Sequence, residues 1–122
     1  MGRIDASLGV DQPAFRALLA LLRDNKVWVK VSGADRATRQ GPPYSDAVPF
    51  ARKLVEECGE RSVWGTDWPH PNHQWPIPND GLLACIVAEI APTQAARKAL
   101  LVDNPQRLYR FAPARQLTGA QT

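Results

Sequence analysis

Apolar residues near the N-terminus recur at the spacing of an amphipathic helix. Positions 15, 18, 19 and 22 are apolar, which corresponds to i, i+3, i+4 and i+7 on one helix face. Asp11 is a suitable N-cap and Pro13 suits a first helical turn, so we place this helix from Asp11 to about Asp24. The residues of the apolar stripe are Phe15, Leu18, Leu19 and Leu22.

The segment Val27–Ser32 is short and rich in β-branched residues and predicts a strand, and Ser62–Gly65 is predicted to be a second short strand. A polar loop follows the first strand and leads to a helix that Ser45 or Asp46 can cap and that Gly59 ends. One face of this helix carries Val48, Ala51, Leu54, Val55 and Cys58.

A proline-rich loop separates the second strand from a run of further helices. The helical pattern restarts at Asp80 and continues to Ala91, and Thr93 can cap a second helix that reaches about Val102. A last turn opens at Asn104, and residues 112–122 are small and polar, which predicts a flexible tail. The four prolines of the loop are Pro69, Pro71, Pro76 and Pro78.

Strand, helix and strand in this order are typical of a parallel crossover, because neighbouring parallel strands need a long connection. The chain is therefore predicted to be an α/β protein. Two strands cannot close a barrel, and the helices outnumber the strands that could receive them. We expect the chain to be part of a larger barrel.

Composition and charge exclude several classes of protein. The 122 residues are 44% hydrophobic and 22% charged, which fits one globular domain. The net charge of +3 arises from basic residues spread between Arg3 and Arg115, so nucleic acid is not expected as a partner. No apolar stretch approaches the roughly 20 residues of a membrane span, and no signal sequence is recognised, so we expect a cytoplasmic protein that does not bind membranes. Cys58 and Cys85 have no second pair and are expected to be buried free thiols.

The segment from Trp64 to His73 contains the residues best suited to chemistry. Asp67 follows an apolar strand, at the place where parallel-barrel enzymes keep catalytic groups. Asp67 could equally hydrogen-bond the turn while the tryptophans cover the barrel end. His70 and His73 could be metal ligands, but their spacing without a second cluster favours histidines of a turn or the surface.

Residues 65–72, Gly-Thr-Asp-Trp-Pro-His-Pro-Asn, resemble the last barrel strand and loop of the amidohydrolase-related hydrolases (amidohydrolase 2). Within that family they are most similar to the 2-pyrone-4,6-dicarboxylate lactonase branch. Three further segments agree with the resemblance, which extends from Gly2 to Tyr109. They are residues 2–5, residues 34–36 with 41–43, and residues 104–109.

The resemblance implies that residues 1–111 form the C-terminal part of a distorted (β/α)8 TIM barrel, with about two parallel strands plus helices. It implies that Asp67 activates water for hydrolysis of a lactone, a small anionic cyclic ester, without an obligatory cofactor. Arg36 would hold a substrate carboxylate, and Asn72 and His70 would contact the substrate. In other branches of the family, a divalent metal such as zinc would bind, with Asp67 as a ligand.

Two alternatives accompany this interpretation. Without the resemblance, Arg36 would be expected to form a salt bridge with Asp35 or Asp46, and Arg39 competes with it for the substrate. The family's His-x-His element and earlier arginines are absent from these residues, so we expect the chain alone to be inactive and to self-associate. The alternative function is a non-catalytic fragment or an interaction module.

Overall fold

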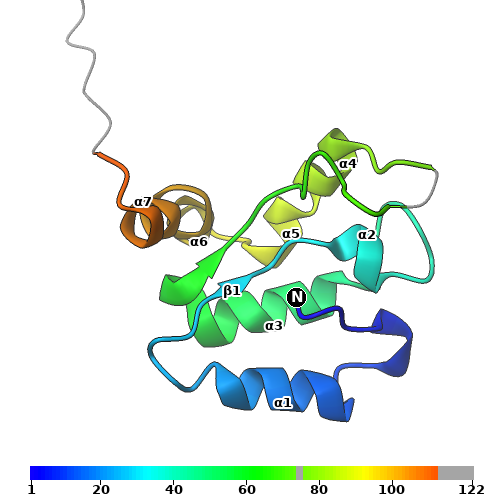
Figure 1. Cartoon of the computed structure of the whole chain (residues 1–122), viewed down its shortest axis with the longest axis horizontal. Coiled ribbons are helices and arrows are strands. Elements are labelled where there is room, and N and C mark those ends of the chain that lie inside the picture. The colour runs from blue at the N-terminus through cyan, green and yellow to red at the C-terminus, as the bar shows by residue number, and fades with distance from the viewer. Residues whose placement is uncertain (74–75, 113–122) are drawn as a thin grey trace, which may run out of the picture.

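The structure is a computed structural model that describes residues 1–73 and 76–112. In the view of Figure 1, α1 and α3 lie on one side of the strands, α4 and α5 on the other, and α6 and α7 at one end. The elements in chain order are η1 (Ala6–Leu8), α1 (Pro13–Leu21), β1 (Val29–Lys30), α2 (Ala34–Ala37), α3 (Val48–Cys58), η2 (Gly59–Arg61), β2 (Ser62–Val63), α4 (Asp80–Cys85), α5 (Val87–Ile90), α6 (Gln94–Lys98), η3 (Ala99–Asp103) and α7 (Asn104–Tyr109).

The two strands pair in parallel, as the sequence predicts. Val29 lies opposite Ser62 and Lys30 opposite Val63. The N–H of Val31 continues the ladder by donating to the carbonyl of Val63 at 2.8 Å. Both strands are shorter than predicted, because regular pairing stops where the chain turns into the loops that follow each strand.

Helices α1 and α3 pack against each other, and Phe50, which the predicted face of α3 does not include, makes a direct contact between them. The rings of Phe15 and Phe50 meet edge to face with 5.0 Å between their centroids. The predicted face of α3 is buried throughout, and Gly59 follows its last residue. Phe15 of α1 and Leu22, its C-cap, are buried, and Leu18 and Leu19 pack against the same core.

The predicted helix caps are wrong in both of these helices. Gln12, rather than Asp11, is the N-cap of α1, and its side-chain amide donates to the carbonyl of Asp5 at 2.8 Å. Ala47 is the N-cap of α3, with no side-chain hydrogen bond. Asp46 instead accepts a short hydrogen bond from the hydroxyl of Thr38. The carboxylate of Asp46 is thus engaged by the preceding loop and does not cap α3.

The polar loop predicted after β1 contains a short helix, α2. Gly33 precedes it with a φ of 85°, a left-handed conformation that glycine adopts at low cost. Ala34 and Ala37 are buried, at 1% and 3% exposure, so one face of α2 packs on the core. This burial, rather than an apolar periodicity, explains why the helix forms.

The C-terminal helices are more broken than predicted. The expected helix from Asp80 to Ala91 is two helices separated at Ile86, and the one after Thr93 changes to a π turn at η3. The Thr93 cap is confirmed by a 3.1 Å hydrogen bond from the N–H of Ala96. Asn104 is buried and donates to the carbonyl of Ser62 at 2.7 Å, which anchors α7 to β2.

The two cysteines differ. Cys58 is buried as expected, whereas Cys85 is exposed, so the expectation of a second buried thiol is wrong. In the described part of the chain, no helix has the length and apolar character needed to cross a membrane. The predicted tail lies, apart from its first residue, outside the described residues.

Candidate active site

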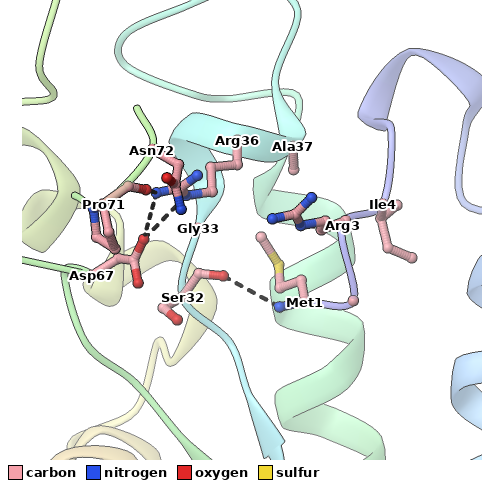
Figure 2. Close-up of a pocket in the computed structure, with 11 residues that line it drawn as sticks. Met1, Arg3, Ile4, Ser32, Gly33, Arg36, Ala37, Asp67, Pro71 and Asn72 are labelled. Atoms are coloured by element: carbon pink, nitrogen blue, oxygen red, sulfur yellow. Dashed lines mark hydrogen bonds and ion pairs between the residues drawn. The ribbon is translucent and has the colours of Figure 1, made fainter. Parts of the chain in front are cut away.

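The carboxyl ends of β1 and β2 open into one cavity of about 330 Å³. Beyond β1 the chain passes through Ser32 and Gly33 into α2, which carries Arg36. Beyond β2 it enters the loop that carries Asp67. Figure 2 shows Arg36 and Asp67 side by side, with Met1, Arg3 and Ile4 of the N-terminal segment opposite them. Parallel pairing therefore brings together two residues that lie 31 positions apart in the sequence.

Arg36 and Asp67 form an ion pair in the cavity wall. The Nε and Nη2 atoms of Arg36 lie 3.1 and 2.9 Å from the same oxygen of Asp67, Oδ2. Their side chains are 26% and 32% exposed, so the pair is reachable from solvent. The expectation of a salt bridge from Arg36 to Asp35 or Asp46 is therefore wrong.

This ion pair leaves further hydrogen-bonding groups available on both side chains. In the described structure nothing hydrogen-bonds Oδ1 of Asp67, which Figure 2 shows directed away from Arg36. Arg36 also donates from Nη2 to the carbonyl of Pro71 at 2.7 Å. A guanidinium has five N–H groups, so the two on Nη1 remain for another acceptor.

The loop after β2 has an unusual backbone. Asp67, His70 and Asn72 have φ values of 70°, 58° and 58°, although none of them is glycine. Left-handed conformations are uncommon for such residues, and Asp, Asn and His tolerate them best. Strained backbone of this kind clusters at functional sites, where the surrounding structure holds it in place.

Asn72 and His70 differ in position, although the resemblance implies substrate contact for both. Asn72 is exposed and lines the cavity beside Arg36. His70 is not among the cavity-lining residues. Its side chain is 2% exposed, and its Nε2 lies 3.0 Å from Oδ1 of Asp80 at the start of α4. His70 therefore connects the loop to α4.

The structure places Arg36 in the cavity wall and Arg39 outside it, and it adds Arg3 to the residues that line the cavity. Arg39 lies outside the cavity wall and pairs with Asp5 through a 2.7 Å contact. Arg3, to which sequence reasoning assigned no role, lines the cavity, and Figure 2 shows its guanidinium pointing toward Arg36. Its presence in the family-like segment of residues 2–5 was the signal that could have revealed it.

The described side chains do not by themselves form a metal site. Within residues 1–73 and 76–112, no three His, Cys, Asp or Glu side chains are arranged to share an ion. Asp67, the ligand implied for metal-dependent branches, has the guanidinium of Arg36 2.9 Å from its carboxylate. A second cation at that oxygen would be repelled.

The family of the chain follows from comparison with known proteins. A family model described as amidohydrolase matches residues 1–111. The chain belongs to the amidohydrolase family. Amidohydrolase relatives include a 2-pyrone-4,6-dicarboxylate hydrolase from Comamonas testosteroni, which is 48% identical over 118 residues. A 4-sulfomuconolactone hydrolase from Hydrogenophaga intermedia is 46% identical over 110 residues.

A solved structure of the same kind shares the fold. The protein from Pseudomonas putida, assigned as a 2-pyrone-4,6-dicarboxylic acid hydrolase, superposes with a TM-score of 0.73 at 37% identity. This match covers 92% of the present chain and 41% of the other. The Comamonas and Hydrogenophaga matches cover 89% and 88% of this chain but 39% and 36% of those relatives. The chain is thus an α/β segment that matches part of the TIM-barrel amidohydrolases and spans about two fifths of their length.

Proposed function

We propose that this chain supplies the Asp67 and Arg36 side of a lactone hydrolase that acts on a cyclic ester with carboxylate groups, such as 2-pyrone-4,6-dicarboxylate. The observation that supports it best is that the two carboxylate oxygens of Asp67 have different surroundings. One carboxylate oxygen is held by Arg36, and the other is available to a water molecule in the cavity.

The reaction needs a base and a place for the substrate's charge. Water attacks the ester carbonyl carbon, Oδ1 of Asp67 accepts the proton, and the ring carbon–oxygen bond breaks to give a ring-opened carboxylate. General base catalysis by a carboxylate contributes about two to four orders of magnitude. Arg36 orients this base by holding Oδ2.

Substrate carboxylates would be received by the cationic part of the cavity. The two N–H groups on Nη1 of Arg36 remain to donate to a substrate carboxylate, whose negative charge the guanidinium complements. Arg3 offers a second cation for a second carboxylate, and the side-chain amide of Asn72 lies in the same wall. His70, being buried, would support the loop rather than contact the substrate.

The experiment joins this chain to the preceding barrel segment of the Comamonas testosteroni hydrolase. We call the product the joined barrel. Hydrolysis of 2-pyrone-4,6-dicarboxylate is followed by the loss of absorbance as the ring opens, with the intact Comamonas enzyme as a positive control. We expect measurable turnover by the joined barrel and none by either part alone. A folded joined barrel without turnover would contradict the proposal.

A further inference from the structure

A second contact joins α2 to the loop after β2, on a different face of α2 from the cavity. Asp35, the residue before Arg36, has a side chain that is only 2% exposed. The Nε2 atom of His73 lies 3.0 Å from its Oδ2. His73 follows Asn72 directly in the sequence. Each partner is therefore one residue away from a side chain of the cavity wall.

This contact compensates for an unfavourable burial. A carboxylate removed from water is costly unless a cation or hydrogen-bond donors face it. In the described structure, neither oxygen of Asp35 accepts a well-aligned hydrogen bond. The Nε2 atom of the His73 imidazole is the polar group that faces Oδ2. Asp35 therefore depends strongly on the position of His73, and so on the position of the loop.

The surroundings of the pair are separate from the reaction cavity. Asp35 and His73 line a second cavity of about 380 Å³, which shares no lining residue with the first. Tyr44 lines it as well, and burial, followed by the negative charge of Asp35, raises the pKa of its phenol. A substitution in this pair thus leaves the groups that face the substrate chemically unchanged.

We propose that Asp35 and His73 are positioning residues that hold α2 and the loop at a fixed separation. Arg36 already joins the same two segments through Asp67 and the carbonyl of Pro71. The Asp35–His73 contact braces them from another face, so that Arg36 and Asn72 can receive one carboxylate together. The role in substrate binding rests on the proposed function, whereas the mechanical link does not.

The link is tested by hydrogen exchange of the 122-residue chain, followed by mass spectrometry. Asp35→Ala and His73→Ala should each speed exchange of residues 66–73 by at least about tenfold, because local opening is governed by local contacts. Exchange of residues 27–33 should stay unchanged in both variants, and the thermal midpoint should stay unchanged in Asp35→Ala. Alanine at position 35 suits a helix and removes a buried charge, so the variant is expected to fold.

Two further variants distinguish the pair from unrelated effects. The double variant should exchange no faster than either single one, since residues that act through one contact are not additive. His73→Gln, which keeps an N–H donor, should restore most of the protection. Glu57→Gln, which breaks the exposed pair with Lys53, is the matched control and should change nothing. Additive effects, or equal acceleration of residues 27–33, would overturn the proposal.

The joined barrel provides the catalytic readout. Asp35→Ala should raise KM for 2-pyrone-4,6-dicarboxylate by about tenfold and change kcat less, because a misplaced binding group weakens uniform binding. Loss of folded protein would instead lower kcat and leave KM unchanged. Faster loop exchange with an unaltered KM would overturn the positioning role. If the joined barrel lacks activity, the proposed function fails, and the exchange experiment still decides the link.

Discussion

The α1/α3 layer and the cavity that contains Arg36 and Asp67 are held together by different forces. In the layer, Phe15 and Phe50 are 1% and 2% exposed and meet through apolar contact. In the cavity wall, Arg36 and Asp67 remain about a quarter to a third exposed and meet through charge. Apolar burial is non-directional and scales with area, whereas an ion pair acts only at a particular geometry.

This difference predicts that substitutions in the two regions have different effects on stability and activity. Removing apolar volume from the layer should lower stability without a specific effect on chemistry. Removing a charge from the cavity should lower activity with little loss of stability, because partly exposed ion pairs contribute about 0–1 kcal/mol. The following experiments test that separation, from the largest expected effect to the smallest.

Phe50→Ala should be the most damaging change. It removes a ring that is 2% exposed and leaves a cavity against Phe15, which typically costs about 3–5 kcal/mol. Denaturant unfolding of the chain measures the effect. Leu21→Ala, at a position that is 57% exposed, is the control and should cost far less. Equal losses at both positions would show that the layer is not the core.

Asp67→Asn should lower kcat of the joined barrel by at least about a hundredfold and leave KM and the thermal midpoint nearly unchanged. The amide keeps the shape of the carboxylate and cannot accept the proton of water. Steady-state kinetics measure the loss. Asp103→Asn, which removes an exposed carboxylate paired with Lys98, should retain full turnover. Near-normal turnover of the first variant would remove Asp67 from the role of base.

Arg36→Met should weaken binding of a lactone dicarboxylate by roughly 2 to 4 kcal/mol if it leaves a substrate carboxylate unpaired. It should affect a neutral lactone much less, which separates substrate binding from the orientation of Asp67. Arg39→Met is the matched control, because Arg39 pairs with Asp5 outside the cavity. A larger loss of binding with Arg39→Met would show that Arg39, rather than Arg36, binds the substrate carboxylate.

The two cysteines offer the smallest and simplest test. A thiol reagent should label Cys85 rapidly, because it is exposed, and Cys58 slowly. Burial raises the pKa of the Cys58 thiol, so its reactive thiolate forms only at higher pH. Labelling of Cys58 should therefore increase as pH rises or when denaturant opens the α3 layer. Equal rates in the native chain would contradict the packing of α3.

Much of the fold could be predicted because its signals are local. The helix stripes around Phe15 and Leu54, the cap at Thr93 and the parallel crossover all follow from spacing within a few turns of chain. The caps at Asp11 and Asp46 were wrong, because α1 begins after Gln12 and the carboxylate of Asp46 bonds Thr38 instead. Helix α2 was missed because its two buried alanines show no periodicity over so short a length.

Three of the predicted site residues, Arg36, Asp67 and Asn72, line the cavity, but the contacts among the cavity residues were not predicted. Placing Asp67 after a strand needed only the order of elements, and the resemblance added Arg36 and Asn72. The ion pair of Arg36 with Asp67 and the burial of His70 depend on left-handed backbone in the loop. Such conformations are decided by the surroundings, which a linear pattern does not contain.

The sequence by itself determined that the chain is an α/β segment with two parallel strands and that Asp67 stands at a strand's carboxyl end. Hydrophobic periodicity and chain order are sufficient for this, because burial of an apolar face selects one pairing of elements. Only the tertiary structure decided that Arg36 meets Asp67, that Arg3 joins them and that Asp35 faces His73. These contacts join residues from segments far apart in sequence, and their directional geometry exists only after packing has fixed the backbone.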